Sequence, residues 1–131
     1  MPILDPPLRT LLLILIPLLT TFIGQRLYLH LVNSNADLFI AGHNVHHLFV
    51  GALLAVPAAF VIAFMPEASW VRWIALASLG IGSAMVLDQI VFLIATDGSN
   101  ASYLRSISFW GAIVLESLAV GLLVVLWLLN A

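Results

Sequence analysis

The chain has 131 residues, of which 63% are hydrophobic and 8% are charged, and its formal net charge is −2. Soluble domains carry roughly a quarter charged residues, so this composition excludes an ordinary soluble domain and indicates a membrane protein. Its four basic residues are all arginines, which is too few for a nucleic-acid-binding patch or a polybasic lipid-binding segment. The absence of cysteine excludes disulfides and thiolate chemistry.

Four apolar windows, separated by turn-forming segments, are long enough to cross a bilayer, which takes about 20 residues for a helix. They are continuous rather than short and alternating, so they favour helices over a β-barrel. We expect spans at Leu8–Leu31, Leu38–Phe64, Trp70–Ala95 and Leu104–Leu129. The sequence therefore predicts an all-α, polytopic membrane protein: one domain over residues 1–131, folded as an up-down-up-down bundle of four transmembrane helices.

Such a bundle has two membrane faces, which we call side A, where the first span begins, and side B, where it ends. Arg9 and Arg72 fall near side A, whereas Arg26 and Arg105 fall near side B. The positive-inside rule therefore sets no orientation and does not identify the membrane. Aromatic residues near the expected helix ends, Tyr103 among them, are typical of interfacial anchors.

Polar residues within or beside the spans gather toward side B. Because charged side chains are costly inside a bilayer, we expect their faces to point into the bundle and meet there. The side A half, by contrast, carries charged residues only at its edge. The side B group comprises Gln25, Arg26, His30, His43, His46, His47, Asp88, Gln89, Arg105 and Glu116.

The stretch HNVHH, residues 43–47, supplies three of the four histidines. On a helix, His43 and His47 lie one turn apart, the spacing that grips a metal ion in zinc proteases, although Asn44 replaces the glutamate of that motif. Helical rise places His47 about 14 Å below side B. Imidazole and carboxylate ligands suit zinc and iron, and also manganese and copper. We predict a divalent metal ion bound by His43, His46 and His47 with Glu116 or Asp88.

The five residues HNVHH resemble the HxxHH histidine box of membrane desaturases and hydroxylases. That family holds two irons with more histidines than the four present here. The resemblance therefore implies a di-iron site only if carboxylates replace the missing imidazoles, as in soluble di-iron bundles. More broadly, four spans with a histidine cluster in the second and GIGSAMVLDQI in the third are similar to small four-helix integral membrane proteins with buried acids. That resemblance implies the fold and brings no activity.

The first hypothesis is an intramembrane metal-binding protein acting as a metal-dependent enzyme, either a hydrolase or an oxidoreductase. Asp88 and Glu116 are its expected catalytic residues. A lipid-like or small amphipathic substrate would enter from side B, where guanidinium groups would receive an anionic headgroup. The expected substrate-binding residues are Arg26, Arg105, Gln25 and Gln89.

Two alternatives use the same residues differently. A small proton-coupled transporter, working as a homodimer, would use Glu116 and Asp88 as proton carriers. Its path must open to both faces, and side A offers few polar residues to line one. A structural or haem-binding subunit would pair Asp88 with Arg26, or would need His30 as an axial haem ligand.

Overall fold

The structure is a computed structural model, and it describes residues 5–31, 39–40, 43–44 and 46–131. Four of its helices are long and apolar enough to cross a membrane, which confirms the all-α transmembrane bundle and makes the chain a multi-pass membrane protein. These helices are α1 (Pro6–Leu31), α2 (His47–Phe64), α3 (Trp70–Ala95) and α5 (Ser106–Leu128). The shorter elements are the helix α4 (Asn100–Tyr103) and the antiparallel strands β1 (Phe39–Ile40) and β2 (His43–Asn44).

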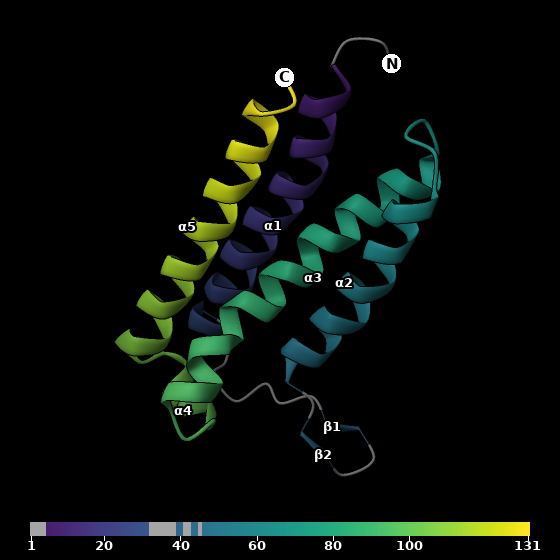
Figure 1. The fold of residues 1–131 in the computed structure, drawn as a ribbon. Helices are drawn as coiled ribbons and strands as arrows, with labels where there is room; N and C mark the ends of the chain where they lie inside the picture. The colour runs from purple at the N-terminus through teal and green to yellow at the C-terminus, as the bar shows by residue number, and fades with distance from the viewer. Residues whose placement is uncertain (1–4, 32–38, 41–42, 45) are drawn as a thin grey trace.

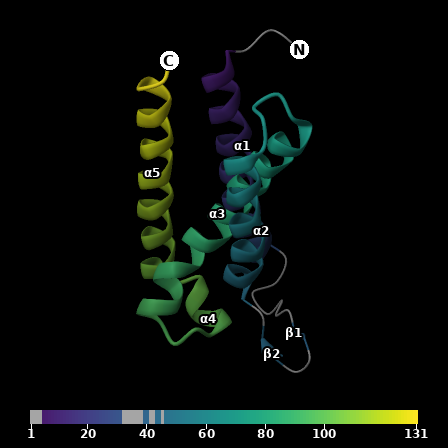
Figure 2. The ribbon, with the colours of Figure 1, turned by 45° about the vertical axis from the view of Figure 1, so that its right-hand side comes forward.

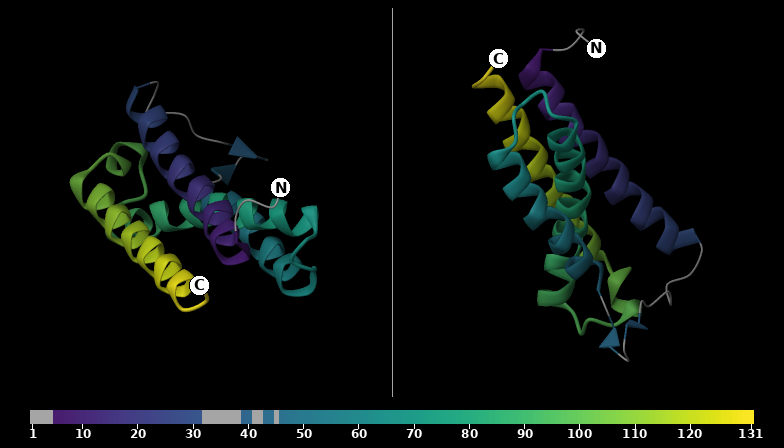
Figure 3. Two further views of the ribbon diagram at one scale, coloured as in Figure 1. Left: turned by 90° about the horizontal axis from the view of Figure 1, so that it is seen from above. Right: turned by 90° about the vertical axis from the view of Figure 1, so that its right-hand side faces the viewer.

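Helix α3 is the centre of the bundle. It packs against α1, α2 and α5, and α2 and α5 lie on opposite sides of it, as Figure 1 and Figure 2 show. The start of α1 and the end of α5 lie at the same end as the α2–α3 connection, whereas α4 and the strands β1 and β2 lie at the other end (Figure 1). The first end is side A and the second is side B. Viewed from side A, α1 lies between α5 and α2 (Figure 3, left).

A row of small residues lets α3 approach α1. At Gly80 a side chain would collide with the backbone carbonyl oxygen of Ile14, Ala84 is fully buried, and Asp88 contacts Arg26. Since later residues of α3 meet later residues of α1, the two helices run in the same direction. The core beside this row consists of Leu18, Phe22, Ala84 and Ala112.

Glycines also set the contact between α2 and α3. A Cβ atom built on Gly82 would lie 2.5 Å from the carbonyl oxygen of Gly51 and 2.8 Å from the backbone nitrogen of Ala55. Only residues without side chains allow backbones to come this close. The α2–α3 pair is therefore a backbone-to-backbone contact that fixes the position of α2 around Gly51 and Ala55.

The second span is shorter than the expected Leu38–Phe64. Helix α2 begins at His47, His46 is its extended N-cap residue, and His43 lies in β2. Glycine, asparagine and histidine are poor helix formers, and residues 42–47 are rich in them. The 18 residues of α2 already span about 27 Å, close to the hydrocarbon thickness of a bilayer. The prediction that His43 and His47 share a helical turn well inside the membrane is therefore wrong.

Candidate functional site

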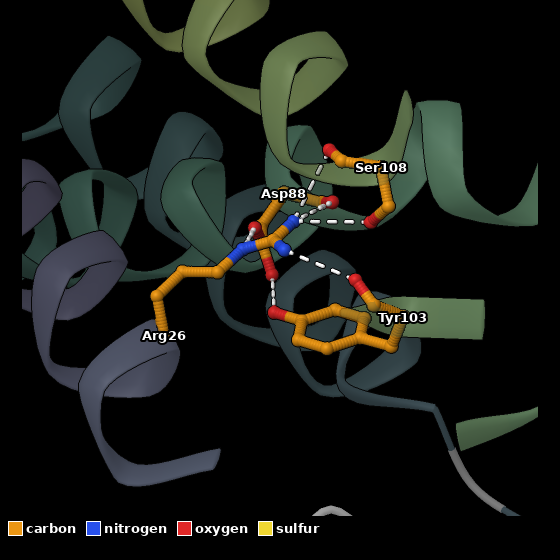
Figure 4. Close-up of polar contacts among 4 residues, drawn as sticks. All are labelled: Arg26, Asp88, Tyr103 and Ser108. Carbon is orange, nitrogen blue, oxygen red and sulfur yellow. Dashed lines mark hydrogen bonds and ion pairs between the residues drawn. The ribbon is translucent and has the colours of Figure 1, made fainter. Parts of the chain in front are cut away.

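A buried ion pair joins α1 to α3 toward side B. Nε of Arg26 donates a 2.6 Å hydrogen bond to Oδ1 of Asp88, and the two residues are 9% and 0% exposed. The second carboxylate oxygen, Oδ2, accepts a hydrogen bond from the hydroxyl of Tyr103. Figure 4 shows the three side chains converging. Because both oxygens of Asp88 have donors, the cost of burying its charge is offset.

The remaining donors of Arg26 connect the ion pair to α4 and α5. Nη1 donates to the carbonyl oxygen of Tyr103 at 3.2 Å, and Nη2 donates to the carbonyl oxygen and hydroxyl of Ser108 at 3.3 and 3.2 Å. The guanidinium also lies 4.2 Å from the centre of the Tyr103 ring. One side chain of α1 therefore ties together α3, α4 and α5 (Figure 4). The pairing expected under the structural hypothesis is present.

Tyr103 was expected to be an anchor at the membrane–water interface. In the structure it lies inside the buried cluster instead. It is 5% exposed, and its ring makes edge contacts with Phe92 and His47, with centroids 5.2 and 5.9 Å apart. Burial, reinforced by the negative charge of Asp88, raises the pKa of Tyr103 above its usual range. The phenol therefore stays protonated and serves as a hydrogen-bond donor. No periodic pattern in the sequence signals this role, because α4 turns the chain back into the bundle.

Glu116 is the second buried acid, and its surroundings are the opposite of those of Asp88. It is 4% exposed, and neither of its carboxylate oxygens has a hydrogen-bond partner among the described residues. It follows Ser108 and Ala112 along one face of α5, at steps of four residues, and both of these are fully buried. That spacing was a usable signal for Ser108, which the sequence analysis missed. An unpaired buried carboxylate costs several kcal/mol, so this group needs a proton or a cation.

Two of the described histidines, His46 and His47, lie at the start of α2. Nε2 of His47 is buried without a hydrogen-bond partner in the described part of the chain, and the ring of His46 packs edge-on against Phe92 at 6.1 Å. His30 is exposed at the end of α1. The side chain of His43 lies outside the described residues.

The four residues expected to bind a substrate differ in their burial and in their hydrogen bonds. Gln89 is buried, and its Oε1 accepts a 2.9 Å hydrogen bond from the backbone N–H of Leu48, so it satisfies a free donor at the start of α2. Gln25 has a buried Oε1 without a partner among the described residues. Arg105 is exposed at the N-cap of α5. Arg26 is buried and engaged with Asp88, so the two arginines do not form one headgroup site.

The described residues do not assemble the expected metal site. No group of three or more histidine, cysteine, aspartate or glutamate residues among them lies close enough to hold a metal ion. Both oxygens of Asp88 are occupied, and His47 and Glu116 belong to helices on opposite sides of α3 (Figure 1). Binding of zinc, iron, manganese or copper stays a prediction, because the side chain of His43 is not described.

Comparison of the chain with protein-family models, with curated proteins and with solved structures finds no match. Its class therefore follows from the fold and the site. It is a four-span membrane protein with one fully satisfied buried ion pair and one buried acid that has no partner among the described residues.

Proposed function

We propose that this protein is a small proton-coupled membrane transporter in which Glu116 carries the proton. The observation that supports this proposal is the burial of both Glu116 oxygens without hydrogen-bond partners among the described residues. A carboxyl group in this position is stable when neutral and costly when ionised, unless a cation replaces the proton. Such a group couples proton release to the binding of a solute.

The proposal assigns different roles to the two acids. Asp88 is held by Arg26 and Tyr103, so its charge is satisfied without a proton and it serves as a structural counter-ion. Glu116 is free of such partners within the described residues. The sequence led us to expect that both acids carry protons. The proposal keeps this role for Glu116 and gives Asp88 a structural one.

The first experiment measures protonation of Glu116 directly. Infrared difference spectra of the protein in lipid nanodiscs, recorded as the pH is raised, should show a protonated-carboxyl C=O band that disappears on ionisation. The band should be absent from Glu116→Gln and present in Glu67→Gln, a matched control because Glu67 is exposed in the α2–α3 connection. A band that persists in Glu116→Gln would overturn the assignment.

The second experiment measures coupling. Proteoliposomes with an imposed pH gradient and an internal pH-sensitive dye are exposed to a panel of small organic cations and anions. A transported solute should collapse the gradient faster with the wild type and with Asp97→Asn, whose carboxyl is exposed in the α3–α4 connection, than with Glu116→Gln. Equal rates for Glu116→Gln and the wild type would separate the carboxyl from transport.

The metal-enzyme hypothesis is distinguished by elemental analysis of untagged, detergent-purified protein beside its His47→Ala variant. Near-stoichiometric metal that is lost in the variant would favour a metal site completed by His43, and the transporter proposal would then give way. Metal at trace level in both proteins would leave Glu116 as the functional group to pursue.

A further inference from the structure

A cavity of about 310 Å³ lies at side A, between the start of α1, the end of α5 and the α2–α3 connection. It is large enough for several water molecules. Its wall is apolar toward the bundle centre and polar toward the membrane surface. The residues that line the cavity include Thr10, Ile14, Glu67, Arg72, Leu123 and Asn130.

The inner end of the cavity lies on the same face of α5 as Glu116. Leu123 and Trp127 follow Glu116 by 7 and 11 residues, close to whole numbers of turns, so all three share one helical stripe of α5. The rise of 1.5 Å per residue puts Leu123 roughly 10 Å along the axis from Glu116. The cavity therefore ends about two helical turns from the buried carboxyl.

One apolar layer separates the cavity from Glu116. Val120 and Leu123 pack against the core that contains Leu18, and these side chains occupy the two intervening turns. Their contacts are dispersion contacts between flexible aliphatic groups, with no hydrogen bond to break. A rotamer change in this layer would join Glu116 to the cavity.

Between Glu116 and side B, the described residues block a water path more firmly than the apolar layer on side A does. Going from Glu116 toward side B along α5, Ala112 and Ser108 are fully buried. The guanidinium of Arg26 then spans the helices, with Asp88 and Tyr103 on either side of it. Opening this route would break several hydrogen bonds to charged groups, which are stronger than hydrogen bonds between neutral groups.

Building on the proposed function, we infer that Glu116 exchanges its proton with water on side A, through the cavity between α1 and α5. The cavity mouth holds Glu67 and Arg72, whose charges favour water over lipid chains. Nη1 of Arg72 donates to the carbonyl oxygens of Ile62 and Met65 at the end of α2, which fixes this side chain at the mouth. The sequence led us to expect a site that opens to side B, whereas the route inferred here opens to side A.

The test uses single cysteines, because the chain has none of its own. Leu123→Cys places a thiol at the cavity wall, and Leu122→Cys, one residue earlier, places it on a face that is 60% exposed toward lipid. The probe is a membrane-impermeant trimethylammonium methanethiosulfonate, which reacts with the thiolate and therefore needs water at the sulfur. We expect Leu123→Cys to react and Leu122→Cys to stay unreactive.

Sidedness is read in sealed vesicles of one orientation. Met65→Cys marks side A and Leu104→Cys marks side B, because both positions are exposed in connections. Leu123→Cys should be modified from the same side as Met65→Cys. Its modification should also slow the response of the Glu116 carboxyl band to a pH jump, with the Leu122→Cys protein treated with the same reagent as the reference.

The outcomes separate this inference from the proposed function. Labelling from the side of Leu104→Cys, no labelling of Leu123→Cys because lipid fills the cavity, or an unchanged pH-jump response would each overturn the side A route. In all three cases the Glu116 band of the wild type would survive, and with it the proton carrier. Loss of that band in the wild type would instead remove the proposed function, whatever the labelling pattern.

Discussion

Arg26 and Glu116 illustrate two fates of a charged side chain placed in a membrane-spanning helix. Arg26 uses Nε, Nη1 and Nη2 in hydrogen bonds to three other elements, so its charge strengthens the fold. Glu116 has no such partner among the described residues. Its burial therefore weakens the fold and is retained only if the carboxyl has another role. The two residues should respond oppositely to neutralisation.

Neutralising one member of the Arg26–Asp88 pair should be strongly destabilising. Arg26→Gln and Asp88→Asn each leave an uncompensated buried charge, which costs about 3–5 kcal/mol of unfolding free energy. The double variant should lose clearly less than the sum of the two single losses. The measurement is unfolding in mixed micelles with increasing denaturing detergent. Additive losses would show that the two groups act independently, contrary to the ion pair.

Because of the Tyr103 hydroxyl, the free energy of unfolding should decrease at alkaline pH. The pKa of Tyr103 is raised in the folded protein, so its contribution is complete below about pH 10, the pKa of an unfolded tyrosine, and is lost as the pH rises above that value. The chain has two tyrosines, no lysine and no cysteine, so few other groups titrate there. Stability measured from pH 8 to 11 should fall less in Tyr103→Phe than in Tyr28→Phe, where the exposed ring of α1 is changed. Equal slopes would contradict this role.

At the scale of elements, glycine positions decide how closely the helices pack. Gly82 of α3 lies against the backbone of α2, whereas Gly121 of α5 has nothing within 4 Å of a would-be Cβ atom. The same residue type is therefore a contact in one helix and an unused position in the other. Sequence spacing alone does not tell these two glycines apart.

Gly82→Ala should destabilise the protein by about 1–3 kcal/mol, because the added methyl group meets backbone atoms that cannot move aside. The matched change Gly121→Ala should be neutral, or should stabilise by up to about 1 kcal/mol, because alanine is the better helix former and space is open. Thermal unfolding of both variants in the same detergent makes the comparison. A stabilising Gly82→Ala would mean that α2 and α3 are less tightly packed than the structure indicates.

Hydropathy predicted the long helices because lipid demands continuous apolar segments with internally satisfied backbones. Three of the four expected spans agree closely with α1, α3 and α5. The start of α2 was misplaced, because an apolar window does not reveal where poor helix formers end a helix. At the site, helical spacing found Arg26, Asp88 and Glu116 as inward-facing residues. It could not find Tyr103, whose position depends on how the α4 segment folds back against α3.

At the scale of the whole molecule, the basic residues favour neither orientation in the membrane. Side A and side B each carry two arginines, so a single added charge should decide which side faces the cytoplasm. Glu67→Lys adds a basic residue to the α2–α3 connection on side A, and Asp97→Lys adds one to the α3–α4 connection on side B. Both positions are exposed, so the two changes are matched.

Reporter tags on the two termini should fall on the same side of the membrane as each other in every variant. Glu67→Lys should increase the fraction of molecules with cytoplasmic termini, and Asp97→Lys should decrease it. Protease protection of the tags in sealed vesicles measures both fractions. A shift in the same direction for both variants would show that features other than basic residues set the orientation.

The central position of α3 has a consequence for how the protein is made. Helices α1 and α2 leave the ribosome before α3, and their extensive contacts are with α3 rather than with each other. They therefore remain in the bilayer as separate helices until α3 is synthesised. Until then Arg26 of α1 lacks its ion-pair partner Asp88. A nascent chain arrested before Trp70 would be a substrate for membrane quality control. Emergence of α3 is the event that converts an inserted chain into an assembled one.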